Sequence, residues 1–329
     1  MRRGRSAWHP EQIPQRGWRD VAWRVYREAG QHRITLLAAG VAFYALLALF
    51  PAIAAVVSIG GLLFDPYEAG QQLRELSRFM PPDAAGLIAR QAQKVAETAE
   101  QRSGVAALIS GIIAMAVATK GVRGLITGLN AVYGEGDYRS RMRHGAMVMA
   151  LTLGLLAMTL VTLGFIALIP FAVTYMPLSS LVERLLYWLR WPVLLVVMSL
   201  LIALLYRFAP YRRAPRWQWL SVGTLLATVL WLLGSGGLSL YARYFSRFSE
   251  LYGSLGAVVV LMLWFWLSAY VVLLGAEVNA QLERQTCRDT TVGREKPMGR
   301  RRAWAADTLG AEHPWHRPDE QGGDDDTGR

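Results

Sequence analysis

Reactive side chains are scarce in this chain of 329 residues. It holds a single cysteine, Cys287, so an intramolecular disulfide and a CxxC redox or metal motif are both excluded. Charged residues make up 18% of the chain, against roughly 25% in an ordinary soluble domain. The composition therefore argues against a soluble globular enzyme.

Metal ligands and phosphate-binding loops are lacking as well. The five histidines are His9, His32, His144, His313 and His316, and only the last two lie close together in the sequence. No HExxH motif is present, and the glycine-rich stretches 121–124 and 234–237 do not fit the GxxxxGK[ST] pattern of a phosphate loop. A catalytic zinc or two-metal site has no obvious ligand set. We expect no catalytic residues, no metal site and no cofactor.

Apolar sequence, in contrast, is abundant. Hydrophobic residues make up 53% of the chain, and residues 34–64 run for 31 positions without a charge, where a helix needs roughly 20 to cross a bilayer. Charged residues bound six apolar segments, which we interpret as membrane spans: 34–64, 103–119, 145–176, 191–206, 217–242 and 251–276. The predicted fold is all-α, a polytopic bundle of six transmembrane helices within residues 34–280.

The positive charge indicates the orientation of these spans. The net charge is +11. Of the 35 lysines and arginines, 26 lie in the two terminal regions and in the loops 120–143 and 207–216. The other 9 lie in the loops 65–102, 177–190 and 243–250. Cytoplasmic segments carry the excess of basic residues in membrane proteins. We therefore expect both termini to lie in the cytoplasm.

Three regions outside the spans have their own character. In residues 1–33, Trp18, Val21 and Val25 recur at helical spacing with arginines between them, which indicates an amphipathic helix that lies either in the membrane interface or against the bundle. The outer loop 65–102 has the pattern of two amphipathic helices. The tail, 281–329, is rich in charged residues, glycine and proline, which predicts disorder.

Polar residues close to the spans are the candidates for function. Glu277 follows an apolar run of 26 residues, and Asn279 lies two positions further on. An acidic group at membrane depth is costly unless it is paired or wetted, so it marks a functional site by default; the alternative is that Glu277 already lies at the water boundary. Asn130 and Tyr133 share a helix face and could form a polar cluster with Arg123, or dock a short interfacial helix.

Small residues and one proline suggest where the bundle could move. Gly121, Gly124 and Gly128 continue a series of small side chains, which allows either close helix packing or a hinge. Pro51 removes a backbone hydrogen bond inside the first span, so it can produce a kink or expose a carbonyl to a polar pathway.

Several of these stretches resemble the YihY/BrkB family of bacterial inner-membrane proteins. The similar segments are Ala42–Pro51, Leu129–Tyr133 and, most specifically, Tyr252–Ala280. The resemblance covers roughly residues 18–284 and leaves out the tail. It implies six membrane helices with both ends cytoplasmic and a link to virulence, without an agreed substrate. Some relatives carry a ribonuclease BN label, which the missing metal ligands do not support.

Two functions remain open at this stage, with ribonuclease activity as the weakest third. The first is transporter-like translocation of a lipid or envelope component through a pathway lined by Asn130, Tyr133, Glu277 and Asn279. The second is a membrane scaffold that recruits partners through its terminal regions. Membrane lipids are the expected partners, no specific nucleic acid is expected, and the small-residue faces suit either internal packing or a homo-oligomer.

Overall fold

A computed structural model of the protein describes residues 3–63, 86, 90, 104–175, 180–244 and 254–313. Within these ranges the regular structure is helical, apart from one isolated antiparallel bridge between Pro215 and Thr291. The elements are η1 (Pro10–Gln12), α1 (Gln15–Gln31), α2 (Ile34–Leu63), α5 (Gly104–Val132), α6 (Arg141–Tyr175), α7 (Ser180–Phe208), α8 (Trp217–Tyr244), α10 (Ser254–Glu283) and α11 (Trp304–Asp307). The outer loop, 65–102, falls outside the described residues except at positions 86 and 90.

The apolar segments become helices that extend beyond the boundaries expected from charge. The predicted span 103–119 overlaps the 29-residue helix α5 from Gly104 onward, and 191–206 lies in the 29-residue helix α7. Lys120 and Arg190 do not end these helices, because a charged side chain is compatible with helical backbone. Four helices of the described chain hold stretches long and apolar enough to cross a membrane: Ile34–Ile53, Leu108–Val132, Trp217–Tyr241 and Gly256–Glu283.

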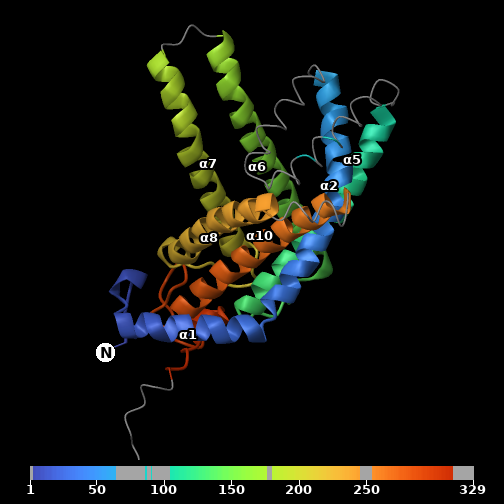
Figure 1. Ribbon diagram of the computed structural model, residues 1–329. Coiled ribbons are helices and arrows are strands. Elements are labelled where there is room, and N and C mark those ends of the chain that lie inside the picture. The colour runs from blue at the N-terminus through green and yellow to red at the C-terminus, as the bar shows by residue number, and fades with distance from the viewer. Residues whose placement is uncertain are drawn as a thin grey trace, which may run out of the picture.

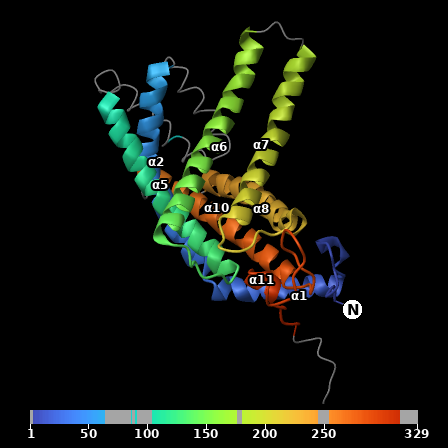
Figure 2. The same cartoon turned by 180° about the vertical axis from the view of Figure 1, so that it is seen from behind.

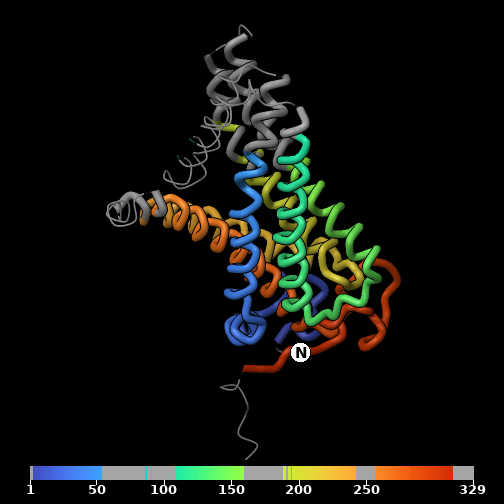
Figure 3. The backbone as a smooth tube through the Cα atoms, turned by 90° about the vertical axis from the view of Figure 1, so that its right-hand side faces the viewer, coloured from blue at the N-terminus to red at the C-terminus, as the bar shows by residue number. Residues whose placement is uncertain are grey.

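The helices share one end of the molecule, which we call the base. Helices α2 and α5 lie side by side, α6 and α7 project from the base as a second pair, and α8 and α10 run obliquely between them (Figures 1 and 2). Helix α1 crosses underneath, and the chain after α10 lies beside it (Figure 3). The N-terminal segment and the segment after α10 are therefore neighbours in space.

Close helix contacts explain several of the small residues. A Cβ atom at Gly223 in α8 would collide with the Gly275 carbonyl oxygen in α10, so the two backbones touch there. A Cβ at Gly128 would lie 2.8 Å from Leu273 Cδ2, and one at Gly124 would lie 3.3 Å from Val41 Cγ2. Glycine at these positions lets neighbouring helices approach closely.

The segment from 281 to 313 is ordered, which corrects the expectation of a disordered tail. Helix α10 continues to Glu283, and the following chain folds back onto the base. The Cys287 N–H donates to the Arg5 carbonyl at 2.7 Å, and the Thr286 hydroxyl donates to the Ala7 carbonyl at 2.7 Å. Composition alone misses this because the charged side chains satisfy one another and backbone carbonyls inside the segment. Residues 314–329 lie outside the described part of the chain.

Helix α1 docks on the bundle through polar residues. Asp20, Arg24 and Glu28, spaced four apart, are buried along with Gly17 and Val21. The sequence left two placements open for this helix, in the membrane interface or against the bundle, and the structure places it against the bundle. The spacing of Trp18 and Val25 suggested an apolar contact face, and both are partly buried beside the polar row.

Candidate functional site: a buried polar layer at the base

Polar side chains from four parts of the chain meet where the helices converge. They come from α1 with its C-cap residue His32, the end of α5, the loop after α7, and the last two turns of α10. We call this set the polar layer; its members are Arg24, His32, Asn130, Tyr133, Arg212, Glu277, Asn279, Gln281 and Glu283.

Glu277 is fully buried and paired. Its Oε2 atom lies 2.8 Å from His32 Nδ1, and its Oε1 atom accepts a hydrogen bond from Gln281 Nε2 at 2.8 Å. The hydrogen bond with Glu277 raises the pKa of His32, against the opposing effect of partial burial, and the charges of Glu277 and Glu28 act in the same direction. The junction between α1 and α2 is thus tied to α10 by the contact between His32 and Glu277.

Asn279 joins α10 to α8 at their closest approach. Its Oδ1 atom accepts the Gly223 N–H at 2.8 Å, and its Nδ2 atom donates to the Leu220 carbonyl at 3.3 Å. Glycine at 223 makes room for this carboxamide, because a Cβ there would come within 2.5 Å of it. Both hydrogen-bonding ends of Asn279 are engaged by helix packing.

The cation beside Tyr133 is Arg212. The Arg212 guanidinium lies 4.2 Å from the centre of the Tyr133 ring and 2.6 Å from Glu283 Oε1, and neither charged side chain has exposed surface. Glu283 also accepts a hydrogen bond from the Thr290 hydroxyl at 2.9 Å. Arg212 Nε and Nη1 and the Tyr133 hydroxyl have no hydrogen-bond partner among the described atoms. Burial raises the pKa of Tyr133, so the phenol stays neutral.

Arg123 does not join this layer. It lies exposed on α5, two turns before Asn130. Asn130 is buried, and its Oδ1 atom accepts the Tyr211 N–H at 2.8 Å, which fixes the loop that carries Arg212. The sequence did not distinguish Arg212 from the topological arginines around it, so the choice of Arg123 as the partner of Tyr133 is corrected.

The predicted hinge residues lie in continuous helices. Pro51 is half-buried inside α2, which runs unbroken from Ile34 to Leu63. Gly121 and Gly124 face α2 within α5, where a Cβ at Gly121 would lie 3.5 Å from Tyr44 Cβ. With Gly128 against Leu273, all three glycines lie at helix contacts, and whether any of them acts as a hinge stays a prediction.

Arg24 is the most heavily bonded member of the polar layer. It has no exposed surface and donates to the Gln281 side chain and carbonyl at 3.1 Å each, to Gln285 Oε1 at 2.6 Å and to the Ala311 carbonyl at 2.8 Å. Burial, with help from Arg284 and Arg5, lowers the pKa of Arg24 to about 10, which still leaves it charged at neutral pH. In the sequence, Arg24 is one of several arginines of an amphipathic helix, and nothing there indicated that it would be buried and hydrogen-bonded.

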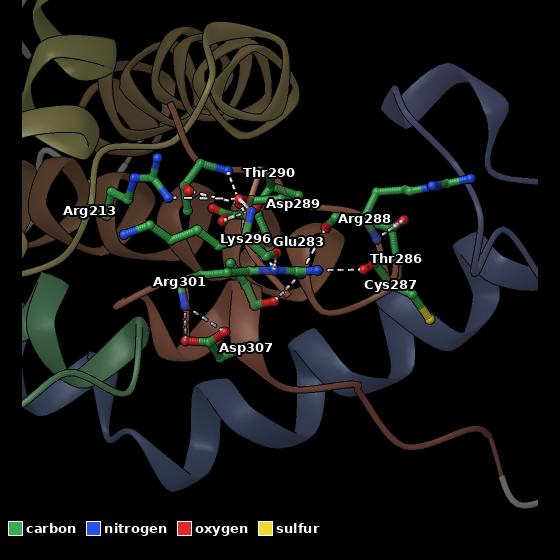
Figure 4. Close-up of polar contacts among 12 residues, drawn as sticks. Arg213, Glu283, Thr286, Cys287, Arg288, Asp289, Thr290, Lys296, Arg301 and Asp307 are labelled. Carbon is green, nitrogen blue, oxygen red and sulfur yellow. Dashed lines mark hydrogen bonds and ion pairs between the residues drawn. The ribbon is translucent and has the colours of Figure 1, made fainter. Parts of the chain in front are cut away.

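A second cluster holds the tail against the base. Arg301 donates to the carbonyls of four residues, which are Cys287, Arg288, Lys296 and Ala306 (Figure 4). Asp289 accepts the Thr291 hydroxyl at 2.7 Å and lies 3.7 Å from Arg213, while Asp307 accepts the Arg301 N–H. These bonds to Asp289, led by that from Thr291, outweigh partial burial and lower its pKa. We call residues 284–313 the cap.

Two surface clefts lie beside the N-terminal segment in the part of the chain that the structure describes. One of about 750 Å³ lies along the N-terminal segment between Gly4 and Arg16, and one of about 430 Å³ lies between Trp8 and Trp217. Neither is lined by members of the polar layer. Among the residues that the structure describes, no three histidine, cysteine, aspartate or glutamate side chains gather in a metal-binding group.

Comparisons with known proteins point to one family. Residues 25–299 match the family model described as "Virulence factor BrkB", so the match reaches into the cap, further than residue 284. The chain is 27% identical over 255 residues to the "Putative ribonuclease-like protein YfkH" of Bacillus subtilis, covering 75% of this chain and 89% of the relative. It is also 27% identical to a "UPF0761 membrane protein" of Cronobacter sakazakii, covering 82% and 89%. No solved structure matches the chain significantly.

Proposed function

The chain belongs to the virulence factor BrkB family of membrane proteins, and on that premise we propose that it crosses the bacterial inner membrane six times with both termini in the cytoplasm. Each of the six apolar segments overlaps a helix of 28 to 35 residues over most of its length. The contacts between residues 3–7 and the cap support the same side for both terminal regions. The bias of 26 basic residues against 9 supports the cytoplasm as that side.

We further propose that the protein translocates a lipid or envelope component, with the polar layer as its cytoplasmic gate. The observation that carries this proposal is the burial of Glu277 at the end of an apolar stretch, paired with His32 from another helix junction. Ionisable groups are expensive at such a depth and mark transport pathways or proton relays in membrane proteins. In the described arrangement the gate is closed, because the polar layer is bridged by hydrogen bonds across α1, α8 and α10.

Reconstitution in liposomes tests the proposal. Protein in vesicles that contain a fluorescently labelled phosphatidylglycerol should speed the movement of the label between leaflets relative to empty vesicles. Glu277→Gln keeps the shape of the side chain and removes its charge, so we expect the rate to change about tenfold or more, equivalent to about 1.4 kcal/mol in a barrier.

The matched control is Glu11→Gln, because Glu11 is exposed in η1 and outside the polar layer. It should leave the rate unchanged. Transport that is equal in wild type and Glu277→Gln would remove the polar layer from the pathway. If no labelled lipid or envelope precursor moves faster than in empty vesicles, translocation itself is contradicted.

A scaffold without transport activity is the second candidate, and the ordered cap favours it. The cap presents a folded surface at the base, and neither described cleft reaches the polar layer. This function predicts that exposed cap substitutions abolish a cellular phenotype while Glu277→Gln does not. The ribonuclease-like name of the Bacillus subtilis relative gives a third candidate function, ribonuclease activity. Chelator-sensitive cleavage of RNA by protein freed of contaminating nucleases would support it.

A further inference from the structure

The cleft between Trp8 and Trp217 combines cationic, aromatic and apolar features that the polar layer does not use. It is lined by Trp8, His9, Arg216, Trp217, Gln218 and Val292 and has a volume of about 430 Å³. Its walls come from the N-terminal segment, the first turn of α8 and the cap. The cap thus contributes Val292 to a cleft whose other walls come from the N-terminal segment and the start of α8.

One arginine lines this cleft, and two others stack on its tryptophan rings. Arg216 lines the cleft and donates its Nε–H to the Thr291 carbonyl at 3.1 Å, which anchors the guanidinium there. Arg207 lies 4.5 Å from the centre of the Trp217 ring, and Arg288 lies 4.4 Å from the centre of the Trp8 ring. A guanidinium stacked on a ring keeps its N–H donors at the edge of the stack, where they can bind a phosphate.

Arg288 points away from the cluster around Arg301 (Figure 4). Its side chain is exposed, and so is nearly half of Trp217. Arginine and tryptophan side chains gather where membrane helices meet the headgroup region. The apolar stretch of α8 begins at Trp217, so the cleft lies at that boundary if α8 crosses the membrane.

The exposed face of α8 continues from the cleft into apolar residues. Gln218, Ser221, Leu225, Val229 and Leu232 are exposed and are separated by three or four positions, so they follow one side of the helix. A polar cleft at one end and an apolar strip beyond it match the two parts of a phospholipid. A soluble phosphate would use only the first.

We propose that this cleft binds the phosphate group of an anionic phospholipid, whose acyl chain lies along the strip from Leu225 to Leu232. The proposal rests on α8 crossing the membrane and does not require translocation. The lipid bridges α8, the N-terminal segment and the cap, so it stabilises the contact between the two terminal regions.

Binding of defined lipids to the delipidated full-length protein in detergent tests this site. Native mass spectrometry should detect phosphatidylglycerol binding more tightly than phosphatidylcholine of the same chain length. Arg216→Gln should weaken phosphatidylglycerol binding about fivefold, the effect expected for one arginine near an anionic lipid. Leu225→Gln should weaken the same binding by interrupting the apolar strip.

Arg141→Gln is the matched control, because Arg141 is an exposed arginine at the first position of α6, away from the cleft. It should change binding less than twofold. Equal weakening by Arg141→Gln and Arg216→Gln would show general charge attraction and overturn the site. Equal binding of phosphatidylcholine would also overturn it.

Inorganic phosphate and glycerol phosphate distinguish a lipid from a soluble anion. Millimolar phosphate should not displace phosphatidylglycerol; full displacement, or glycerol phosphate binding as tightly, would identify an anion site and overturn the lipid proposal. If Arg216→Gln fails to purify as a single species, Trp217→Leu tests the same cleft from its half-exposed wall and should also weaken phosphatidylglycerol binding. Lipid binding that persists while translocation fails would separate this site from the proposed transport function.

Discussion

At the scale of single residues, Glu277 illustrates how a carboxylate is accommodated at the end of an apolar helix. His32 and Gln281 occupy its two oxygens at 2.8 Å each. A buried charge that is paired and hydrogen-bonded costs far less than an isolated one. The sequence pointed to Glu277 through its position after 26 apolar residues, but its partner lies 245 positions away, where no local pattern indicates it.

The pair predicts a pH dependence of stability. The pKa of His32 is raised in the folded protein, so its charged form is bound more strongly there than in the unfolded chain. The contribution of charged His32 is therefore fully present below its unfolded pKa of about 6.5 and is lost as the pH rises through the higher folded pKa. The groups around it are Glu277, Glu28 and Arg284.

Thermal unfolding of wild type and His32→Gln in detergent measures this effect. The wild type should be more stable at pH 5.5, and the difference between the two proteins should shrink as the pH is raised to 9. Both proteins are delipidated for this measurement, and His9→Gln then provides a control, because His9 lies outside the polar layer and its cleft holds no lipid. A difference that is constant with pH would show that the stabilisation does not depend on the charge of His32.

At the scale of elements, the helices could be predicted and their partners could not. Apolar runs longer than roughly 20 residues predict membrane helices. The ends of α5 and α7 were misplaced because charges were taken as boundaries. Docking of α1 was one of the two predicted placements, but its contact face was not predicted. The buried row of Asp20, Arg24 and Glu28 is polar and has the pattern of a solvated face.

The contact between α8 and α10 predicts opposite effects for two glycines of one helix. Gly223→Ala should destabilise the protein by about 1–3 kcal/mol, because the added methyl group meets the Gly275 carbonyl and the Asn279 side chain. Gly236→Ala should be neutral or stabilise by up to about 1 kcal/mol, since nothing lies within 4 Å of its Cβ and alanine favours the helix. Unfolding in SDS titrations measures both variants. Equal effects would contradict close packing at Gly223.

At the scale of the whole molecule, the two terminal regions form one structure at the base. Gln285 Nε2 donates to the Arg3 carbonyl at 2.7 Å, and Arg5 donates to the Gly310 carbonyl at 2.9 Å. Composition predicted disorder for the tail because it is rich in charged residues, glycine and proline. Order comes instead from arginines that donate to backbone carbonyls. Such an arrangement depends on tertiary partners and leaves no periodic pattern in the sequence.

Truncation of the tail tests the mutual dependence of these regions. Removing residues 284–329 should raise hydrogen exchange at Ala7, Gln12 and Ile13 by about fivefold or more, since hydrogen bonds worth about 1 kcal/mol each are lost around them. Removing only 314–329 keeps every contact described for the cap and should leave exchange unchanged. Unchanged exchange after the longer deletion would show that the N-terminal segment holds its structure alone.

The bonds of Arg24 also bear on how the protein is made. Its acceptor on Gln281 lies 257 positions later in the chain. At a synthesis rate of about 5–20 residues per second, Gln281 is added roughly 10 to 50 seconds after Arg24. During that interval α1 has no buried place for its charge and stays in contact with water or lipid headgroups. The base therefore closes last, and a ribosome that stalls before Gln281 leaves a chain whose first helix has not docked.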